Sequence, residues 1–173
     1  QLVNSVNSET GRANQSFEKI ESGVVELATH LSALYTQEAK LGKGNYWNAV
    51  DSLIQLEDGR YGNSADDVSS VYVPAKATLD DVTLSGLNTS AYLDFSAPAA
   101  LESNPSLLAI YSIDRQAITR YYPNINLASL VPPDFNPTER AYYKITSPLF
   151  NPAKTARWAI PYVDAAGGGL VVT

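Results

Sequence analysis

LLAIYSIDRQAITRYY, residues 107–122, is the clearest β-hairpin in the sequence. Two segments rich in apolar, β-branched and aromatic residues, 107–113 and 117–122, flank a tight turn of polar residues. Pro123 ends the second segment, because proline cannot donate a hydrogen bond to a neighbouring strand. The hairpin predicts an antiparallel sheet, and the other elements are predicted to lie around it.

Further elements are predicted on both sides of this hairpin. Upstream, residues 68–73 form a predicted strand that Pro74 stops, and residues 79–87 form a short helix. Downstream, residues 157–163 and 170–173 are predicted to pair around a glycine-rich turn. Helices come first and an antiparallel meander follows, so the sequence predicts an α+β fold and not alternating βαβ units.

Residues 1–41 are predicted to form one long helix that the sequence Gly-Lys-Gly at 42–44 ends. Packing of this helix onto its own domain and contact between two such helices in a homodimer are both compatible with the pattern. We expect the helix (1–41) to precede a single α+β domain at 42–173. The apolar positions alternate in steps of four and three: Ile20, Val24, Leu27, Leu31 and Leu34.

Composition excludes several classes of protein. The chain has 173 residues, 45% of them hydrophobic, which predicts one folded domain. A net charge of −6 leaves no cluster of Lys and Arg for phosphates, so we expect no nucleic-acid partner. No apolar run approaches the length of about 18 residues that predicts a membrane span. Methionine is absent and the last residues resemble a strand, so we expect a segment of a longer protein, incomplete at the C-terminal end of its sheet, with membrane spans in flanking regions.

The sequence offers little catalytic chemistry. His30 is the single histidine and cysteine is absent, so a zinc site lacks its usual ligands. No G-x-S-x-G motif presents a nucleophile. The acidic pairs at 66–67 and 80–81 fit turns and helix starts and lack the spacing of a calcium loop. We therefore expect no enzymatic activity, no cofactor and no metal, with hydrolysis by a carboxylate pair as the least favoured alternative.

A capped helix is predicted to begin after Asn136. Asn136 is a good N-cap, Pro137 suits the first helical position, and Glu139 completes a capping box. This helix is predicted to carry Arg140 and to end before Pro148.

Tyrosine is abundant, with 11 residues in the chain. Its flat apolar ring and polar hydroxyl suit a pocket that holds a small polar ligand, and a nearby Arg140 can hold a carboxylate with two hydrogen bonds. Alternatively, the tyrosines line a core and Arg140 pairs with a structural carboxylate; residue types alone leave both interpretations open. The tyrosines concerned are Tyr92, Tyr111, Tyr121, Tyr122, Tyr142, Tyr143 and Tyr162.

Three segments together resemble the Cache family of sensor domains, also called PDC sensors. They are FNPTERAYY at 135–143, WAIPYVD at 158–164 and LVVT at 170–173. That family shows an aromatic residue, a proline, R-x-W-Y, a strand ending in P-Y-x-D, a glycine turn and a V-V-T strand. The resemblance implies a long N-terminal helix and a PAS-like antiparallel sheet with short flanking helices. It also implies the extracytoplasmic, periplasmic or extracellular, part of a bacterial membrane receptor such as a histidine kinase or a chemoreceptor.

The resemblance further implies the residues that face a ligand. Arg140 matches the arginine that holds a ligand carboxylate, and the hairpin residue Tyr122 is added from the tyrosine set. Phe135 lacks the hydroxyl that is often present at its position and Tyr142 replaces the usual Trp, which weighs against an amino acid and leaves a carboxylate or another small anion. The remaining predicted ligand-binding residues are Phe135, Tyr142, Tyr143, Tyr162 and Asp164.

Two functional hypotheses follow from the sequence. The first is a sensor in which a small molecule, such as an organic acid or an amino acid, binds beside Arg140 and shifts the packing of the long helix. The second is a ligand-free scaffold of the same fold, used for dimerisation or for contact with another protein. The size of the pocket distinguishes them, because rings that fill it favour the scaffold.

Overall fold

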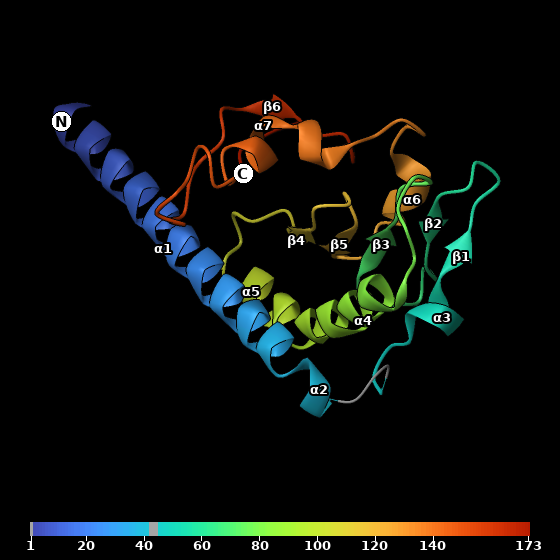
Figure 1. The fold of residues 1–173 in the computed structure, drawn as a ribbon. Coiled ribbons are helices and arrows are strands. Elements are labelled where there is room, and N and C mark those ends of the chain that lie inside the picture. The colour runs from blue at the N-terminus through green and yellow to red at the C-terminus, as the bar shows by residue number, and fades with distance from the viewer. Residues whose placement is uncertain (1, 42–44) are drawn as a thin grey trace.

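The computed structural model describes residues 2–41 and 45–173, with side chains from residue 9 onward. The long helix α1 (Leu2–Thr36) projects from a body of short helices and small antiparallel sheets (Figure 1), which confirms the predicted α+β fold. A break at Gln37 separates it from α2 (Glu38–Leu41), so residues 1–41 form two helices and not one. The predicted helix stop at 42–44 lies outside the described residues.

The central sheet has three strands with β5 in the middle. β5 (Thr119–Tyr122) pairs antiparallel with β3 (Ser70–Tyr72) on one side and with β4 (Ile110–Ile113) on the other. Ile110 lies opposite Tyr122 across β4 and β5, so the predicted hairpin is confirmed.

Two short strand pairs flank the central sheet. β1 (Ile54–Gln55) and β2 (Tyr61–Gly62) form one pair, which a bridge between Tyr61 and Val73 joins to the segment that follows β3. β6 (Tyr162–Val163) and β7 (Leu170–Val171) form the other pair. The predicted pairing of 157–163 with 170–173 is thus confirmed, but over a shorter length than expected.

Side chains of β5 alternate between two separate hydrophobic cores. Ile118 and Val71 face α4 (Asp81–Ser90) in a core that also contains Trp47 and Leu87. The opposite face of the sheet packs in a second core of Tyr72, Leu127, Ala128, Val131 and Phe135. The central sheet therefore separates a helix-covered face from a face that is open to the C-terminal third of the chain.

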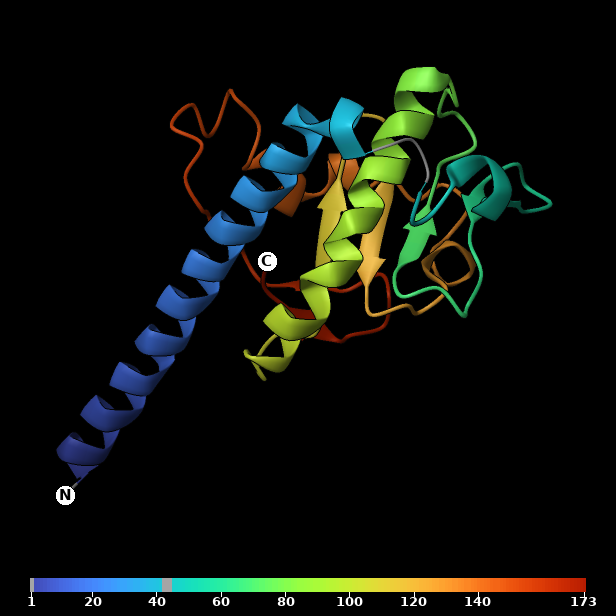
Figure 2. The same cartoon turned by 90° about the horizontal axis from the view of Figure 1, so that it is seen from below.

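Helix α4 covers the first face of the sheet and lies beside α1 (Figure 2). The predicted helix is present, but it begins two residues later and ends three residues later than the predicted range 79–87. Asp80 is its N-cap, and its side chain accepts a hydrogen bond from the Thr83 backbone N at 2.8 Å. The chain then continues through η1 (Ala91–Phe95) and α5 (Ala97–Glu102) before it enters β4. The remaining short helices α3 (Ala49–Ser52) and α6 (Leu127–Leu130) were not predicted.

The C-terminal half of α1 packs on its own domain, as the first interpretation of the apolar pattern predicted. Ile20, Leu27, Leu31 and Leu34 are half-buried, whereas Val24 is 50% exposed. Within the part of the chain with described side chains, residues 9–19 are all exposed. No described helix combines the length and the apolar character needed to cross a bilayer.

Four contacts hold α1 against the body. The Trp158 indole Nε1 donates to Glu21 Oε1 at 2.5 Å, and its ring meets Phe17 edge-on at 4.8 Å between centroids. Lys19 Nζ donates to the Ser103 carbonyl. Near the other end of the helix, the Tyr35 hydroxyl donates to the Gly86 carbonyl of α4 at 3.3 Å.

The predicted single helix after Asn136 is wrong. The Asn136 side chain accepts from Thr138 N at 3.2 Å, as a cap should, but only a 3-10 turn, η2 (Pro137–Glu139), follows. Arg140 then adopts an extended backbone (φ −79°, ψ 153°) before α7 (Ala141–Lys144) begins. The Glu139 carboxylate accepts from the Asn136 side chain and not from its backbone, so the capping box that would extend the helix is incomplete.

Replacing Trp158 by alanine is expected to loosen the middle of α1 without unfolding the sheet. The change removes both the ring contact with Phe17 and the indole hydrogen bond to Glu21. Hydrogen–deuterium exchange should rise severalfold in residues 17–24 and stay unchanged in β3. Phe150→Ala removes an aromatic side chain that is already 64% exposed and should leave α1 protected; equal effects of the two variants would contradict this docking.

Candidate functional site

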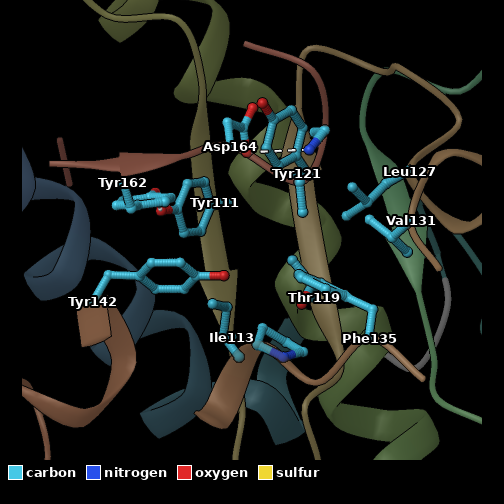
Figure 3. A pocket seen from close by; sticks show the side chains of 13 residues that line it. Tyr111, Ile113, Thr119, Tyr121, Leu127, Val131, Phe135, Tyr142, Tyr162 and Asp164 are labelled. Carbon is cyan, nitrogen blue, oxygen red and sulfur yellow. Dashed lines mark hydrogen bonds between the residues drawn. The ribbon is translucent and has the colours of Figure 1, made fainter. Parts of the chain in front are cut away.

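A cavity lined largely by tyrosine lies on the second face of the central sheet (Figure 3). Rings from β4, β5, α7 and β6 approach one another across it, and the segment after η2 closes one side. Its volume is about 30 Å³, which is room for about two water molecules. We call it the tyrosine cavity; its lining residues are Tyr111, Ile113, Thr119, Tyr121, Leu127, Val131, Phe135, Pro137, Tyr142, Tyr162, Asp164, Ala165 and Ala166.

The four tyrosine rings contact one another in sequence. Tyr121 and Tyr111 stack across β5 and β4, with centroids 5.6 Å apart and planes at 4°. Tyr142 meets Tyr111 edge-on at 6.1 Å and Tyr162 at 5.0 Å. Figure 3 shows the Tyr142 ring pointing from α7 across the cavity towards the sheet. The cavity is small because these rings contact one another and fill most of the space between them.

The tyrosine hydroxyls differ in their hydrogen bonding. Thr173 Oγ1 lies 2.9 Å from the Tyr111 hydroxyl and 2.5 Å from the Tyr162 hydroxyl. The hydroxyls of Tyr121 and Tyr142 have no hydrogen-bond partner among the residues that the structure describes, and both side chains are half-buried. Each can therefore donate to or accept from a ligand or a water molecule.

Asp164 supplies the only carboxylate of the lining. Its two oxygens accept from the backbone N of Ala166 at 3.2 Å and of Gly168 at 3.0 Å, and so shape the turn before β7. A Cβ atom at Gly168 would lie 2.8 Å from Asp164 Oδ2, so this close approach requires glycine. Figure 3 shows the carboxylate beside the Tyr121 ring, where a negative charge faces the cavity.

Burial keeps the cavity phenols protonated. It raises the pKa of Tyr121 to about 12, with a further rise from the Asp164 charge. Burial likewise raises the pKa of Tyr142 to about 12, and it raises the pKa of Tyr111 still further. The cavity therefore presents neutral hydroxyl groups over the whole physiological range of pH.

The structure brings four of the predicted site residues together. Phe135, Tyr142, Tyr162 and Asp164 all line the tyrosine cavity. The segment before η2 and α7 carry Phe135 and Tyr142, and β6 with the turn after it carries Tyr162 and Asp164; these segments meet over the same face of the sheet.

The other three predicted residues do not line the cavity. Arg140 is exposed, and its guanidinium carbon lies 5.4 Å from the centroid of the Phe135 ring. Its guanidinium forms no hydrogen bond or ion pair with any residue that the structure describes. Tyr143 and Tyr122 are half-buried elsewhere. The extended backbone at Arg140, where a helix was predicted, separates its side chain from the cavity.

The predicted site residues missed most of the lining on the sheet itself, including Tyr111, Tyr121 and Thr119. Tyr121 and Thr119 share one face of β5, and Tyr122 points to the other. Side chains alternate between the two faces along residues 118–121. Once Ile118 is assigned to the helix-covered core, the alternation places Thr119 and Tyr121 on the cavity face.

A wider, polar hollow of about 230 Å³ lies at the turn that joins β4 to β5. Its two cationic side chains, Lys76 and Arg115, are exposed. The side chains of Gln116 and Asn136 are already used in hydrogen bonds within the fold. The hollow is larger than the tyrosine cavity, but its charges lie on unanchored side chains, so we place the candidate site at the tyrosines.

Other chemistry has little support in the described part of the chain. No three His, Asp or Glu side chains there come close enough together to hold a metal ion. His30 is exposed on α1.

The chain matches no protein-family model, no curated protein and no solved structure. The family resemblance of residues 135–173 therefore stays a prediction, and the cavity has to be judged by its own geometry.

The buried phenols are expected to titrate late, together with unfolding. Since the pKa of Tyr121 and Tyr142 lies near 12 in the folded protein and near 10 in the unfolded chain, the folded state holds these protons more tightly. Their contribution to stability is complete below pH 10 and is lost as the pH rises towards 12. Phenolate absorbance and near-ultraviolet circular dichroism, followed together, should show a late step that coincides with loss of tertiary structure.

Tyr121→Phe and Tyr142→Phe serve as controls for this titration. Each should remove one phenol from the late step and none from the early one. Ionisation of all 11 tyrosines near pH 10 with the fold intact would contradict the burial of these rings.

Proposed function

We propose that this chain is the ligand-sensing domain of an extracytoplasmic bacterial receptor and that the tyrosine cavity is its ligand site. The observation that carries the proposal is a half-buried cavity with two phenol hydroxyls, those of Tyr121 and Tyr142, that no described residue satisfies. Neither hydroxyl is fully buried and neither has a partner among the described residues, so each can donate to or accept from a polar occupant of the cavity. The resemblance to Cache sensors supports the receptor, its extracytoplasmic location and its flanking membrane spans.

The lining favours a small ligand that is neutral or positively charged. No Lys, Arg or His contributes to the cavity wall, whereas Asp164 adds a carboxylate and four phenol rings offer their π faces. Aromatic faces and a carboxylate attract ammonium groups, and the phenol hydroxyls can accept from or donate to hydroxyl groups. An organic acid would need a cationic partner, and Arg140 would have to turn into the cavity to provide one. We therefore consider amines and polyols better candidate ligands than organic acids.

Ligand binding requires the cavity to open. Pockets that hold small molecules usually have volumes of about 300–1,000 Å³, far above the 30 Å³ present here. The Tyr142 ring on α7 is the natural part to move, because a four-residue helix carries it and its hydroxyl has no partner to hold it. The described conformation is then the ligand-free state, and a ligand selects an open one.

The ligand test is a thermal-shift screen of amines, amino acids, polyols and organic acids. We expect a hit among the amines or polyols, and Tyr142→Ala should weaken its binding at least about tenfold, because it deletes one ring and one hydroxyl of the site. Tyr143→Ala on the same helix is the matched control and should bind like the unmodified protein. Equal loss in both variants, or a hit that depends only on Arg140, would reject the tyrosine cavity as the site.

A second candidate function is the ligand-free scaffold, and two observations favour it. The tyrosine rings nearly fill their cavity, and α1 leaves Phe17, Val24 and Val25 between 45% and 51% exposed. Such apolar side chains on a projecting helix are suited to contact with a second copy of the helix.

Self-association through α1 is tested by sedimentation. Val24→Lys combined with Val25→Lys should convert a dimer to a monomer, because a dimer contact would bury both lysines. Ser22→Lys adds a charge at an exposed polar position of the same helix and should leave the dimer intact. A protein that is monomeric at high concentration before any substitution would remove this candidate.

A further inference from the structure

Arg120 is buried in the middle of β5, on the face opposite the tyrosine cavity. It is 3% exposed, and its guanidinium carbon lies 4.6 Å from the centroid of the Trp47 ring. Nε donates to Ser90 Oγ at 2.9 Å and Nη2 donates to the Leu87 carbonyl at 3.2 Å. Both partners belong to the last turn of α4, so one side chain fastens the central strand to the helix.

The third nitrogen of this guanidinium is unsatisfied. Nη1 lies 3.8 Å from Asp94 Oδ2, within reach of an ion pair but too far for a hydrogen bond. Among the described residues it is the only buried side-chain nitrogen or oxygen without a hydrogen-bond partner. The Asp94 carboxylate instead accepts from Ser69 Oγ and from the Tyr46 hydroxyl. A charge pair built only for stability would be expected to close this gap.

Burial disfavours the charged form of both Arg120 and Asp94. It lowers the pKa of Arg120 and raises the pKa of Asp94. An apolar residue of similar volume often stabilises a core as well as a buried ion pair does. The pair therefore calls for an explanation other than stability, and its position relative to the cavity offers one.

The neighbours of Arg120 in β5 are walls of the tyrosine cavity. Thr119 and Tyr121 line it from the other face of the same strand. On the helix side, α4 contacts α1 through the hydrogen bond from Tyr35 to the Gly86 carbonyl, one residue before Leu87. Ser85 also donates to Glu38 of α2. An unbroken series of contacts thus runs from the cavity wall through Arg120 and the end of α4 to the long helix.

We propose that Arg120 is a positioning residue that couples the tyrosine cavity to α1 and that its open Nη1–Asp94 gap is the element that changes. A small displacement of β5, made when the cavity rings move, brings Nη1 within hydrogen-bond distance of Asp94 or takes it further away. The hydrogen bonds to Ser90 and Leu87 carry that displacement to the end of α4, and α4 carries it to α1. The inference rests on the proposed sensor function for its purpose, but the coupling itself can be measured without a ligand.

The test uses a cavity substitution as the input and amide exchange as the readout. Tyr121→Leu removes the ring that stacks on Tyr111 from the cavity face of β5. Hydrogen–deuterium exchange is then measured in α1 (residues 27–34), with β3 as internal reference. In the unmodified background Tyr121→Leu should raise exchange in α1 about threefold or more relative to β3. In an Arg120→Met background it should add nothing.

Matched variants separate coupling from loss of stability. Ile118→Ala truncates a buried side chain that directly precedes β5 and faces the same core as Arg120, but it leaves every Arg120 contact in place, so the response of α1 to Tyr121→Leu should persist. Arg120→Lys keeps the charge and should restore part of the response. If Arg120→Met does not fold, Asp94→Asn replaces it, because it removes the charge that faces Nη1, and it should abolish the response as well.

Two outcomes would overturn the inference. One is an equal rise of α1 exchange in the Arg120→Met or Asp94→Asn background and in the unmodified one. The other is loss of the response in Ile118→Ala as complete as in Arg120→Met. Because no ligand is used, a failed ligand screen would reject the proposed sensor function and leave this coupling standing, whereas a failed exchange test would reject the coupling and leave the ligand site standing.

Discussion

The register of the β4–β5 hairpin is the constraint on which both faces of the sheet depend. Side chains alternate strictly along a strand, so a slip of one residue would turn Arg120 into the tyrosine cavity and Tyr121 towards α4. The turn fixes the register, because Asp114 Oδ1 accepts from the backbone N of Gln116 at 2.8 Å and of Ile118 at 2.9 Å. Ala117 accepts a positive φ of 67° to complete it. The cavity wall and the buried guanidinium are therefore set by a single turn.

The tyrosine cavity is closed by weak contacts, which makes opening feasible. Ring pairs of the kind formed by Tyr111, Tyr121, Tyr142 and Tyr162 contribute about 0.5–1.5 kcal/mol each beyond their burial. A ligand that separates one pair has to replace that energy and gains hydrogen bonds with the hydroxyls of Tyr121 and Tyr142. The Thr173 hydroxyl holds Tyr111 and Tyr162 at the opposite side, so the two halves of the cavity differ in rigidity. The tyrosine cavity thus has one wall held by hydrogen bonds and one wall held by ring contacts alone, and the second is the wall that the proposed ligand would displace.

Local patterns in the sequence predicted the elements better than the site. The α+β class, the 107–122 hairpin, the long helix and the cap at Asn136 all follow from hydrophobic period, proline and capping chemistry within a short window. Arg140 was expected on a helix beside the ligand, but it lies exposed in one extended residue between η2 and α7, and no local pattern marks that residue. Tyr122 was predicted in place of Tyr121 because the sequence of a strand does not show which of its two faces will line a cavity; that depends on the segments that pack on each face. Arg120 drew no attention, since a lone arginine between apolar residues does not reveal whether it is buried.

Arg120 also explains why the helix-covered core tolerates so much polarity. Asp94, Ser69, Tyr46 and Ser90 all converge there, and each is partnered within the fold. Removing one member of such a buried set leaves the others with unpaired groups, so the set has few intermediate arrangements. A core with few intermediate arrangements responds to a displaced strand by switching and not by yielding gradually. Arg120 still has one unpaired donor, so a change of partner there breaks no existing hydrogen bond of that nitrogen. Arg120 also lies next to Tyr121 in β5, on the face opposite the tyrosine cavity.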